Sequence, residues 1–237
     1  MAAMTPSVTI VSVFPGLLGT YGDAGNEMAL VHRLRSRDVP VEVVRVEPGS
    51  PVPTSGDIYL LGGGEDRAQA LAADLIGPAL RRAVDAGATV FGVCAGFQIL
   101  GETFSDSSRT TYPGLGLLDV VTEPLPHRAV GEAVVACALP GTSSVVGFEN
   151  HRGGTRLGAG AEPFGRVVAG VGNALTPGTE GARSGRVLGT YLHGPVLALN
   201  PALADFLLQG VVSSLSPIDD ALALRARAHR LASPHAH

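Results

Sequence analysis

The sequence of 237 residues contains no lysine, and all 17 of its basic residues are arginine. A genome rich in GC codons would account for this bias. Whatever its origin, the absence excludes a P-loop lysine, a kinase-type lysine and a Schiff-base lysine. We therefore expect any ATP-driven or pyridoxal-dependent step to take place on another chain.

Cysteine and patterned charge are also scarce. Two cysteines do not make a disulfide framework, and Cys94 and Cys137 lack a zinc-ligand spacing. The net charge of -4 includes no basic or acidic block, which argues against a nucleic-acid surface or a polybasic membrane patch. The N-terminus has no basic region and meets Pro15 after a short apolar run, so we predict neither a signal peptide nor a membrane span. These features predict a cytoplasmic protein in a reducing compartment, with small polar or acidic metabolites as ligands.

The hydrophobic residues make up 45% of the chain, enough for one sizeable core and a single domain. Four β-branched, apolar runs predict strands buried on both faces, at residues 7–13, 41–46, 57–61 and 88–93. Helical spacing between them predicts helices over 26–37 and 68–86, and Asp23 is placed to be the N-cap of the first. Strands that alternate with helices predict an α/β fold with a mostly parallel central sheet.

The pattern changes between about residues 114 and 189, where glycine-rich turns separate short β-like runs at 130–137, 145–148, 166–170 and 187–191. We interpret this part as a mixed or antiparallel extension of the sheet. Further helices are predicted over 201–210 and 218–232. The predicted division is a domain over residues 1–212, followed by a C-terminal helix and frayed tail over 213–237.

The most informative motif is V-F-G-V-C-A-G-F-Q-I-L-G at residues 90–101. A strand, a Gly-x-Cys-x-Gly turn centred on Cys94 and a helix form the pattern of a nucleophile elbow. The partial positive charge of the helix N-terminus would favour the reactive thiolate. The alternative is a buried structural cysteine in a tight turn, and we favour the nucleophile. Cys137 lies in an apolar run without glycines, so we predict an inert core residue.

A thiolate nucleophile needs a base, and His193 is the best placed of seven histidines. It follows an apolar run and precedes a glycine, and ligands gather at the carboxyl ends of parallel strands, where Cys94 is also predicted. A histidine at a strand end is more often structural. We favour His193 as the base because its predicted position matches the one that Cys94 requires. The other candidates are weaker: His32 is on a helix, His127 is in a proline-flanked loop, and His229, His235 and His237 belong to the tail.

The third element is the glycine-rich stretch L-L-G-G-G-E-D-R-A-Q at residues 60–69. Backbone N–H groups of Gly63 and Gly64 could point at an oxyanion, with Ala95 N–H as a second donor. Each such donor contributes on the order of a hundredfold to a thousandfold in rate. A glycine-rich loop by itself is weak evidence, and it gains weight only beside the cysteine and the histidine.

These motifs resemble class I glutamine amidotransferase domains, and in particular the cobyric-acid-synthase-type branch, which has H-G where commoner members have H-P-E. The chain resembles most the glutaminase subunits of two-subunit lipid II isoglutaminyl synthases. The resemblance covers most of the chain up to about Gln209 and rests on the elbow and on Y-G-D-A-G-N (21–26), L-G-G-G-E-D-R-A-Q (61–69), G-F-E-N-H-R-G-G-T-R-L-G (147–158) and G-T-Y-L-H-G-P-V-L-A-L-N-P-A-L-A-D (189–205).

The resemblance implies that Cys94 attacks the side-chain amide of L-glutamine and that His193 protonates the departing ammonia. Water then releases glutamate from a thioester. The ammonia would pass to a MurT-like Mur-ligase subunit in a heterodimer, which amidates the α-carboxylate of D-glutamate in lipid II. The implied ATP and Mg²⁺ belong to that partner, and no cofactor is expected on this chain.

Pro195 stands where most class I members carry the glutamate that orients the histidine. The resemblance suggests that a carboxylate of the partner orients His193, so we expect the isolated chain to be a weak or silent glutaminase. It also implies that Arg128 and Gln98 contact the substrate, although Arg128 fits a solvated loop arginine equally well. Three further residues of a family-like motif are predicted to form part of the pocket wall, and we assign them no chemical role: Glu149, Asn150 and His151.

Other functions stay open at this point. The nearest is a glutaminase for a cobyric acid or cobyrinate synthetase, which usually shares its chain with the synthetase. A catalytically silent scaffold would not need both Cys94 and His193. A cysteine hydrolase of the DJ-1 or PfpI type would lack the segment after His193. A metal site of Cys94, His151 and His193 is disfavoured because no helical or hairpin ligand pair is present.

Overall fold

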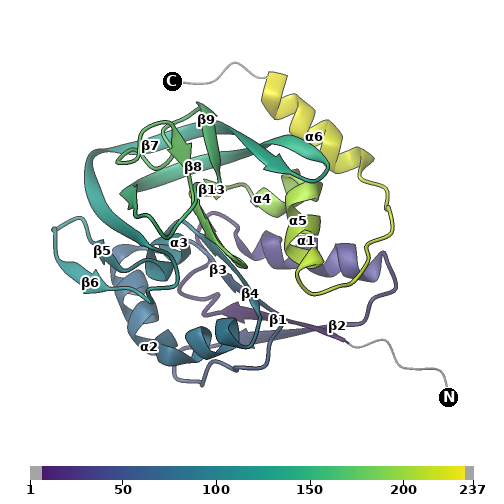
Figure 1. The fold of residues 1–237 in the computed structure, drawn as a ribbon, viewed down its shortest axis with the longest axis horizontal. Coiled ribbons are helices and arrows are strands. Elements are labelled where there is room, and N and C mark those ends of the chain that lie inside the picture. Colours follow the sequence, from purple (N-terminus) through teal and green to yellow (C-terminus); the bar gives the residue numbers. More distant parts are fainter. Residues whose placement is uncertain (1–6, 233–237) are drawn as a thin grey trace.

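A computed structural model describes residues 7–232 and shows a six-stranded sheet at the centre of the molecule (Figure 1). Five strands are parallel: β12 (Val187–Thr190), β4 (Thr89–Val93), β3 (Ile58–Leu61), β1 (Val8–Val13) and β2 (Val41–Val46), in that order. The short strand β11 (Ala182–Ser184) pairs antiparallel with the outer side of β12. The predicted parallel sheet is therefore confirmed.

The four strands predicted near the N-terminus coincide with β1, β2, β3 and β4 to within one residue. The prediction that all four are buried on both faces is wrong for β2. Only Val46 of β2 is buried, and Val41 is partly exposed. The reason is its position: β2 is the edge of the sheet, where it has a neighbour on one side only.

Helices cover both faces of this sheet, because successive side chains of a strand point to opposite faces. From β1, Ile10 joins an apolar cluster with helices α1 (Ala24–Arg35) and α5 (Pro201–Gln209). The next residue, Val11, joins the cluster on the other face, with α2 (Asp66–Asp85) and α3 (Ala95–Leu100). α2 was predicted as one helix, but it is broken at Gly77, whose φ is 49°.

A long hairpin extends the fold away from the parallel sheet. β7 (Val120–Leu139) and β8 (Thr142–Leu157) pair antiparallel. The first part of β7 also pairs with β5 (Thr103–Ser105), which pairs with β6 (Thr111–Pro113). The last part of β7 pairs with β9 (Gly165–Ala169), which pairs with β10 (Thr179–Glu180). This confirms the predicted antiparallel extension. The run at 187–191, assigned to that extension from its sequence, instead supplies β12 of the parallel sheet.

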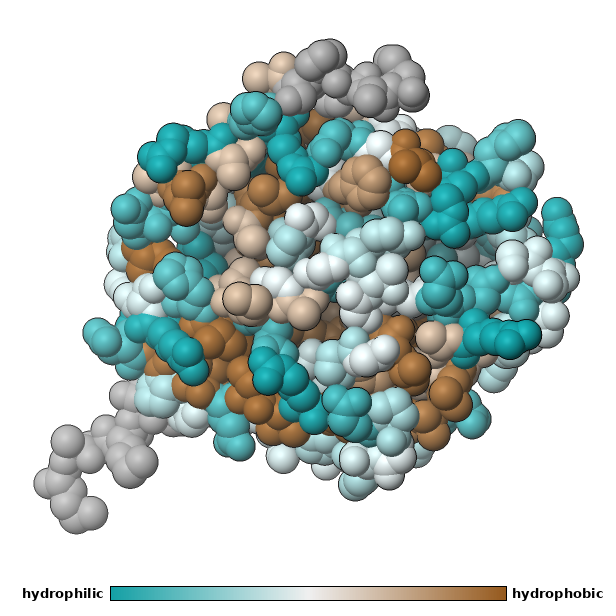
Figure 2. All heavy atoms as spheres, turned by 180° about the vertical axis from the view of Figure 1, so that it is seen from behind, coloured by the Kyte–Doolittle hydropathy of each residue, from teal (hydrophilic) through white to brown (hydrophobic). Residues whose placement is uncertain are grey.

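The chain returns to the extension through β13 (Leu192–His193), which pairs with β8 and leads into α4 (Val196–Leu199). The last helix, α6 (Ala221–Ala232), packs beside α4 and β8, and Arg230 forms an ion pair with Glu132 of β7. Among residues 7–232, no helix is long and apolar enough to cross a membrane. Exposed apolar side chains form several separate groups on the face in Figure 2.

Candidate active site

Cys94 lies at the turn between β4 and α3, as the elbow motif predicted. The backbone of Cys94 has a φ of 53° and a ψ of -105°, a strained conformation for any residue other than glycine. Glycines make this turn possible: a Cβ at Gly96 would lie 2.3 Å from the Leu61 carbonyl oxygen. The backbone N–H of Cys94 donates to the Thr190 carbonyl at 2.8 Å, which ties the elbow to β12. The predicted elbow geometry is confirmed.

His193 lies at the carboxyl end of the sheet beside Cys94 and is 1% exposed. Its Nδ1 lies 3.1 Å from both carboxylate oxygens of Asp23, so Nδ1 carries a proton and donates it. The other ring nitrogen, Nε2, is buried and has no nitrogen or oxygen partner among residues 7–232. Burial lowers the pKa of His193, but hydrogen bonds and charge interactions with Asp23 and Cys94 outweigh it and raise the pKa to about 9. The raised pKa favours the imidazolium form of the ring at neutral pH.

The expectation that a partner's carboxylate orients His193 is wrong, because Asp23 of the same chain already occupies that position. Asp23 is 170 residues away in sequence and is itself buried. It stands at the N-cap position of α1, as predicted, but its side chain makes no capping hydrogen bond. The carboxylate instead accepts hydrogen bonds from His193 and from the Gly63 N–H, which lies 2.7 Å away. The isolated chain was expected to be weak or silent because this carboxylate was predicted on the partner, and Asp23 supplies it.

The whole Y-G-D-A-G-N motif packs against the segment that carries the histidine. The Tyr21 ring meets the His193 ring edge to face, with 5.0 Å between centroids. A Cβ at Gly25 would lie 2.3 Å from the Pro195 ring, and Asn26 accepts a hydrogen bond from the first turn of α4 at 3.0 Å. The sequence did not indicate the contact of Asp23 with His193, because an aspartate just before a helix is ordinarily an N-cap.

The predicted oxyanion role of Gly63 is contradicted, because its N–H already donates to Asp23. Gly63 must instead be a glycine because its Cα lies close to the side chains of His193, Asp23 and Cys94. A Cβ there would lie 2.8 Å from His193 Cε1 and 3.6 Å from Cys94 Cβ. Gly64 and Ala95 do line the cavity in front of Cys94, and their role as oxyanion donors stays a prediction.

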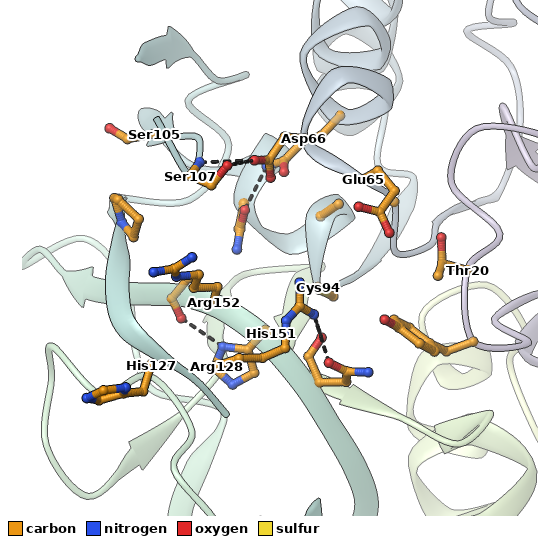
Figure 3. Close-up of a pocket in the computed structure, with 18 of the residues that line it drawn as sticks. Thr20, Glu65, Asp66, Cys94, Ser105, Ser107, His127, Arg128, His151 and Arg152 are labelled. Carbon is orange, nitrogen blue, oxygen red and sulfur yellow. Dashed lines mark hydrogen bonds between the residues drawn. The ribbon is translucent and has the colours of Figure 1, made fainter. Parts of the chain in front are cut away.

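A cavity of about 500 Å³ opens in front of Cys94, between the carboxyl end of the parallel sheet and the β7–β8 hairpin. In Figure 3, Arg128 and Arg152 of the hairpin lie across this cavity from Glu65 and Asp66 at the start of α2. Such a charge distribution suits a ligand that carries both a carboxylate and an ammonium group.

The two predicted substrate contacts both line this cavity. The exposed Arg128 guanidinium is steadied by a 2.8 Å hydrogen bond to Asn150 Oδ1. Gln98 is buried, accepts a hydrogen bond from Gln69 at 2.7 Å and donates one to the Tyr191 hydroxyl at 3.3 Å. Their contact with substrate remains a prediction.

The predicted pocket wall is confirmed for Asn150 and His151. The His151 ring stacks on the Tyr191 ring at 3.8 Å, and its Nδ1 lies 2.8 Å from the Gly153 carbonyl. Glu149 is not in the wall: it lies behind, where its carboxylate accepts backbone hydrogen bonds from the loop after β9.

Cys137 lies in β7 as a free thiol, and burial raises its pKa, which disfavours the thiolate. The raised pKa agrees with the predicted inertness, but Cys137 is half-buried at the margin of an apolar cluster and not in the core as predicted. Within the described residues, no group of three or more histidine, cysteine or acidic side chains could hold a metal ion.

The family model and the similar proteins all point to glutamine amidotransferases. A family model described as the CobB/CobQ-like glutamine amidotransferase domain matches residues 11–201. The chain is 37% identical over 206 residues to the lipid II isoglutaminyl synthase (glutamine-hydrolyzing) subunit GatD of Staphylococcus aureus, covering 85% of this chain and 83% of the relative. The corresponding Streptococcus pneumoniae subunit is 32% identical, covering 83% and 77%.

Cobyric acid synthase of Sphingopyxis alaskensis is 36% identical, but the match covers 71% of this chain and 34% of that protein. Among solved structures, a glutamine amidotransferase has a TM-score of 0.56 at 23% identity, covering 86% of this chain and 98% of the other. A second one, from Thermotoga maritima, has a TM-score of 0.55 at 13% identity, covering 94% and 93%. These likenesses confirm the predicted fold.

Proposed function

Because the chain belongs to the CobB/CobQ-like glutamine amidotransferase family, we propose that it is the glutaminase subunit of a lipid II isoglutaminyl synthase. The observation that carries the proposal is the Cys94–His193–Asp23 arrangement, in which His193 and Asp23 are buried and Cys94 lines a polar cavity. A nucleophile, a base and an oriented carboxylate are the parts that covalent amide hydrolysis requires.

In the proposed reaction, the Cys94 thiolate attacks the side-chain amide carbon of L-glutamine. The N–H groups of Gly64 and Ala95 stabilise the negative charge that develops on the amide oxygen. The His193 imidazolium then gives its Nε2 proton to the amide nitrogen. The carbon–nitrogen bond breaks, ammonia leaves, and a thioester remains on Cys94.

His193 acts in the opposite sense in the second half of the reaction. Its neutral ring takes a proton from water, and the resulting hydroxide attacks the thioester carbon. Glutamate leaves and Cys94 returns to the thiolate. Asp23 holds the proton on Nδ1 throughout, so that Nε2 always faces the reacting atoms. The balance is one glutamine and one water to one glutamate and one ammonia, with no cofactor on this chain.

The lipid II assignment is supported by the extent of the match. The alignment with the Staphylococcus aureus subunit spans 83% of that protein, whereas the alignment with cobyric acid synthase spans 34%. The absence of lysine supports a division of labour, since a chain without a P-loop lysine makes ammonia but does not activate a carboxylate with ATP. A MurT-like partner subunit in the cytoplasm would hold ATP and Mg²⁺ and amidate the α-carboxylate of D-glutamate.

The test is glutamate release from glutamine by the isolated chain and by its mixture with a MurT-like Mur-ligase subunit. Because Asp23 supplies the orienting carboxylate, we expect the isolated chain to release glutamate and the partner to raise the rate. Cys94→Ser should abolish release, and Cys137→Ser is the matched control that should retain it. Release that persists in Cys94→Ser would overturn the mechanism.

The acceptor is tested separately. With ATP, Mg²⁺ and lipid II, the mixture should produce amidated lipid II, detected by a mass decrease of about one dalton per site, because an amide replaces a carboxyl. If cobyrinate-type substrates are amidated and lipid II is not, the chain serves a cobyric acid-type synthetase instead.

A further inference from the structure

The strand that carries His193 changes sheets just before it reaches the active site. Thr190 is the last residue of β12 and pairs with Val93 in the parallel sheet. Only two residues later, β13 pairs antiparallel with β8, with His193 opposite Phe148. The bend between the two strands is centred on Tyr191. Its shape therefore decides where the His193 ring lies relative to Cys94.

A buried carboxylate, Glu180 of β10, lies at this bend. One of its oxygens, Oε1, accepts hydrogen bonds from the Tyr191 N–H at 2.7 Å and from the Thr190 hydroxyl at 2.9 Å. The Thr190 hydroxyl in turn accepts a hydrogen bond from the Leu192 N–H at 3.1 Å. Three successive residues before His193 are thus held by one carboxylate and one hydroxyl.

The same residues also hold the nucleophile. The Thr190 carbonyl accepts the hydrogen bond from the Cys94 N–H. Tyr191 turns to the other side of the bend, where its ring stacks on His151 and its hydroxyl contacts Thr155 at 2.7 Å. A shift of the bend would move the base and the cavity wall together.

The carboxylate is costly to bury. Glu180 is fully buried, and its second oxygen, Oε2, has no hydrogen-bonding partner in the described part of the chain. Burial raises the pKa of Glu180 to about 7, against the hydrogen bonds from Tyr191 and Thr190, which lower it. A neutral side chain would avoid this cost, whereas a carboxylate accepts stronger hydrogen bonds.

We propose that Glu180 is a positioning residue that acts through Thr190 and the bend at residues 190–192 to hold His193 in register with Cys94. It does not touch the substrate. This inference rests on the proposed glutaminase function. What it claims about the structure is that Glu180 keeps His193 aligned with Cys94. That alignment can be measured without any turnover of glutamine.

The first arm of the test is kinetic and uses Glu180→Gln, which keeps the shape and removes the charge. We expect kcat for glutamate release to fall at least tenfold, with KM for glutamine unchanged within about twofold. Glu162→Gln is the matched control, because the Glu162 carboxylate is exposed and pairs only with Arg183 in the described structure. An unchanged kcat in a folded Glu180→Gln variant would overturn the proposal.

The second arm measures the rate of Cys94 alkylation by iodoacetamide as a function of pH, with Cys94→Ser to subtract the reaction of Cys137. An aligned imidazolium favours the reactive thiolate. The rates are compared above about pH 7.5, where the wild-type Glu180 carries its charge, and in Glu180→Gln we expect the alkylation rate to fall at least tenfold. A profile identical to wild type would overturn the proposal. If wild type releases no glutamate, the proposed function fails while this arm still tests the positioning role.

The third arm covers the case in which Glu180→Gln does not fold, as judged by circular dichroism and thermal unfolding. Thr190→Val removes the bridging hydroxyl and should reproduce the loss of Cys94 alkylation in the same pH range. Thr190→Ser restores the hydroxyl and should recover at least half of the wild-type rate. Equal rates in the valine and serine variants would overturn the proposal, because the relay through the hydroxyl is then irrelevant.

Discussion

Asp23→Asn is the substitution that most directly tests the site. It keeps the size of the side chain and removes the charge that faces His193 Nδ1 at 3.1 Å. The pKa of His193 rises from 6.5 to about 9, although burial by itself lowers it, and hydrogen bonding to Asp23 leads the causes that raise it. Without that carboxylate, only Cys94 still opposes the effect of burial, so the pKa of His193 should fall well below 9.

The size of the effect follows from this shift. Cys94 shares in the shift, so if Asp23 carries about two pKa units of it, the loss of Asp23 corresponds to about 3 kcal/mol, at 1.36 kcal/mol per unit. If that energy is lost from the transition state, the rate falls roughly a hundredfold. An asparagine amide can also donate to Nδ1, which would leave the proton on the wrong nitrogen. We therefore expect kcat at neutral pH to fall by about two orders of magnitude.

The assay is glutamate release by the isolated chain at saturating glutamine, with Asp74→Asn, an exposed aspartate of α2, as the control. Far-UV circular dichroism would check that both variants fold. A kcat for Asp23→Asn within about threefold of wild type would refute the argument, because it would mean that this chain does not need Asp23 to orient His193.

The same pair predicts how stability depends on pH. The folded-state pKa of His193 is raised, so its contribution to stability is fully present below about pH 6.5 and is lost as the pH rises through about 9. The difference in free energy of unfolding between wild type and Asp23→Asn should therefore be large near pH 6 and small near pH 9.5. Urea unfolding at both pH values measures it, and equal differences would contradict the assignment.

Three further substitutions test other parts of the structure. Gly63→Ala places a Cβ 2.8 Å from His193 Cε1, so kcat should fall at least about tenfold in a folded protein; wild-type turnover would show that the ring can move aside. Arg128→Ala should raise KM for glutamine about tenfold with little change in kcat, as expected for loss of a carboxylate contact; an unchanged KM would remove Arg128 from the binding site. Arg33→Met leaves two partly buried aspartates without their main cation, so the free energy of unfolding should fall by about 2 kcal/mol in urea titrations, and an unaltered midpoint would contradict the role of this ion-pair network.

The features that the sequence predicted well are local. The elbow around Cys94 could be found because a strand, a Gly-x-Cys-x-Gly turn and a helix follow one another in the chain, and such a strained turn accepts few residue types. The buried strands could be found because each is a short apolar run with turn residues at its ends. The edge position of β2 and the break of α2 at Gly77 were missed, because neither changes the apolar pattern within its own segment.

By itself, the sequence determined the strand–turn–helix elbow at Cys94 and the α/β class of the fold. The tertiary structure alone decided that Asp23 orients His193, that Gly63 provides room and not an oxyanion donor, and that residues 187–193 cross from one sheet to the other. These outcomes depend on contacts between residues up to 170 positions apart. Such contacts are set by strand order and register, which the composition of any single segment does not specify.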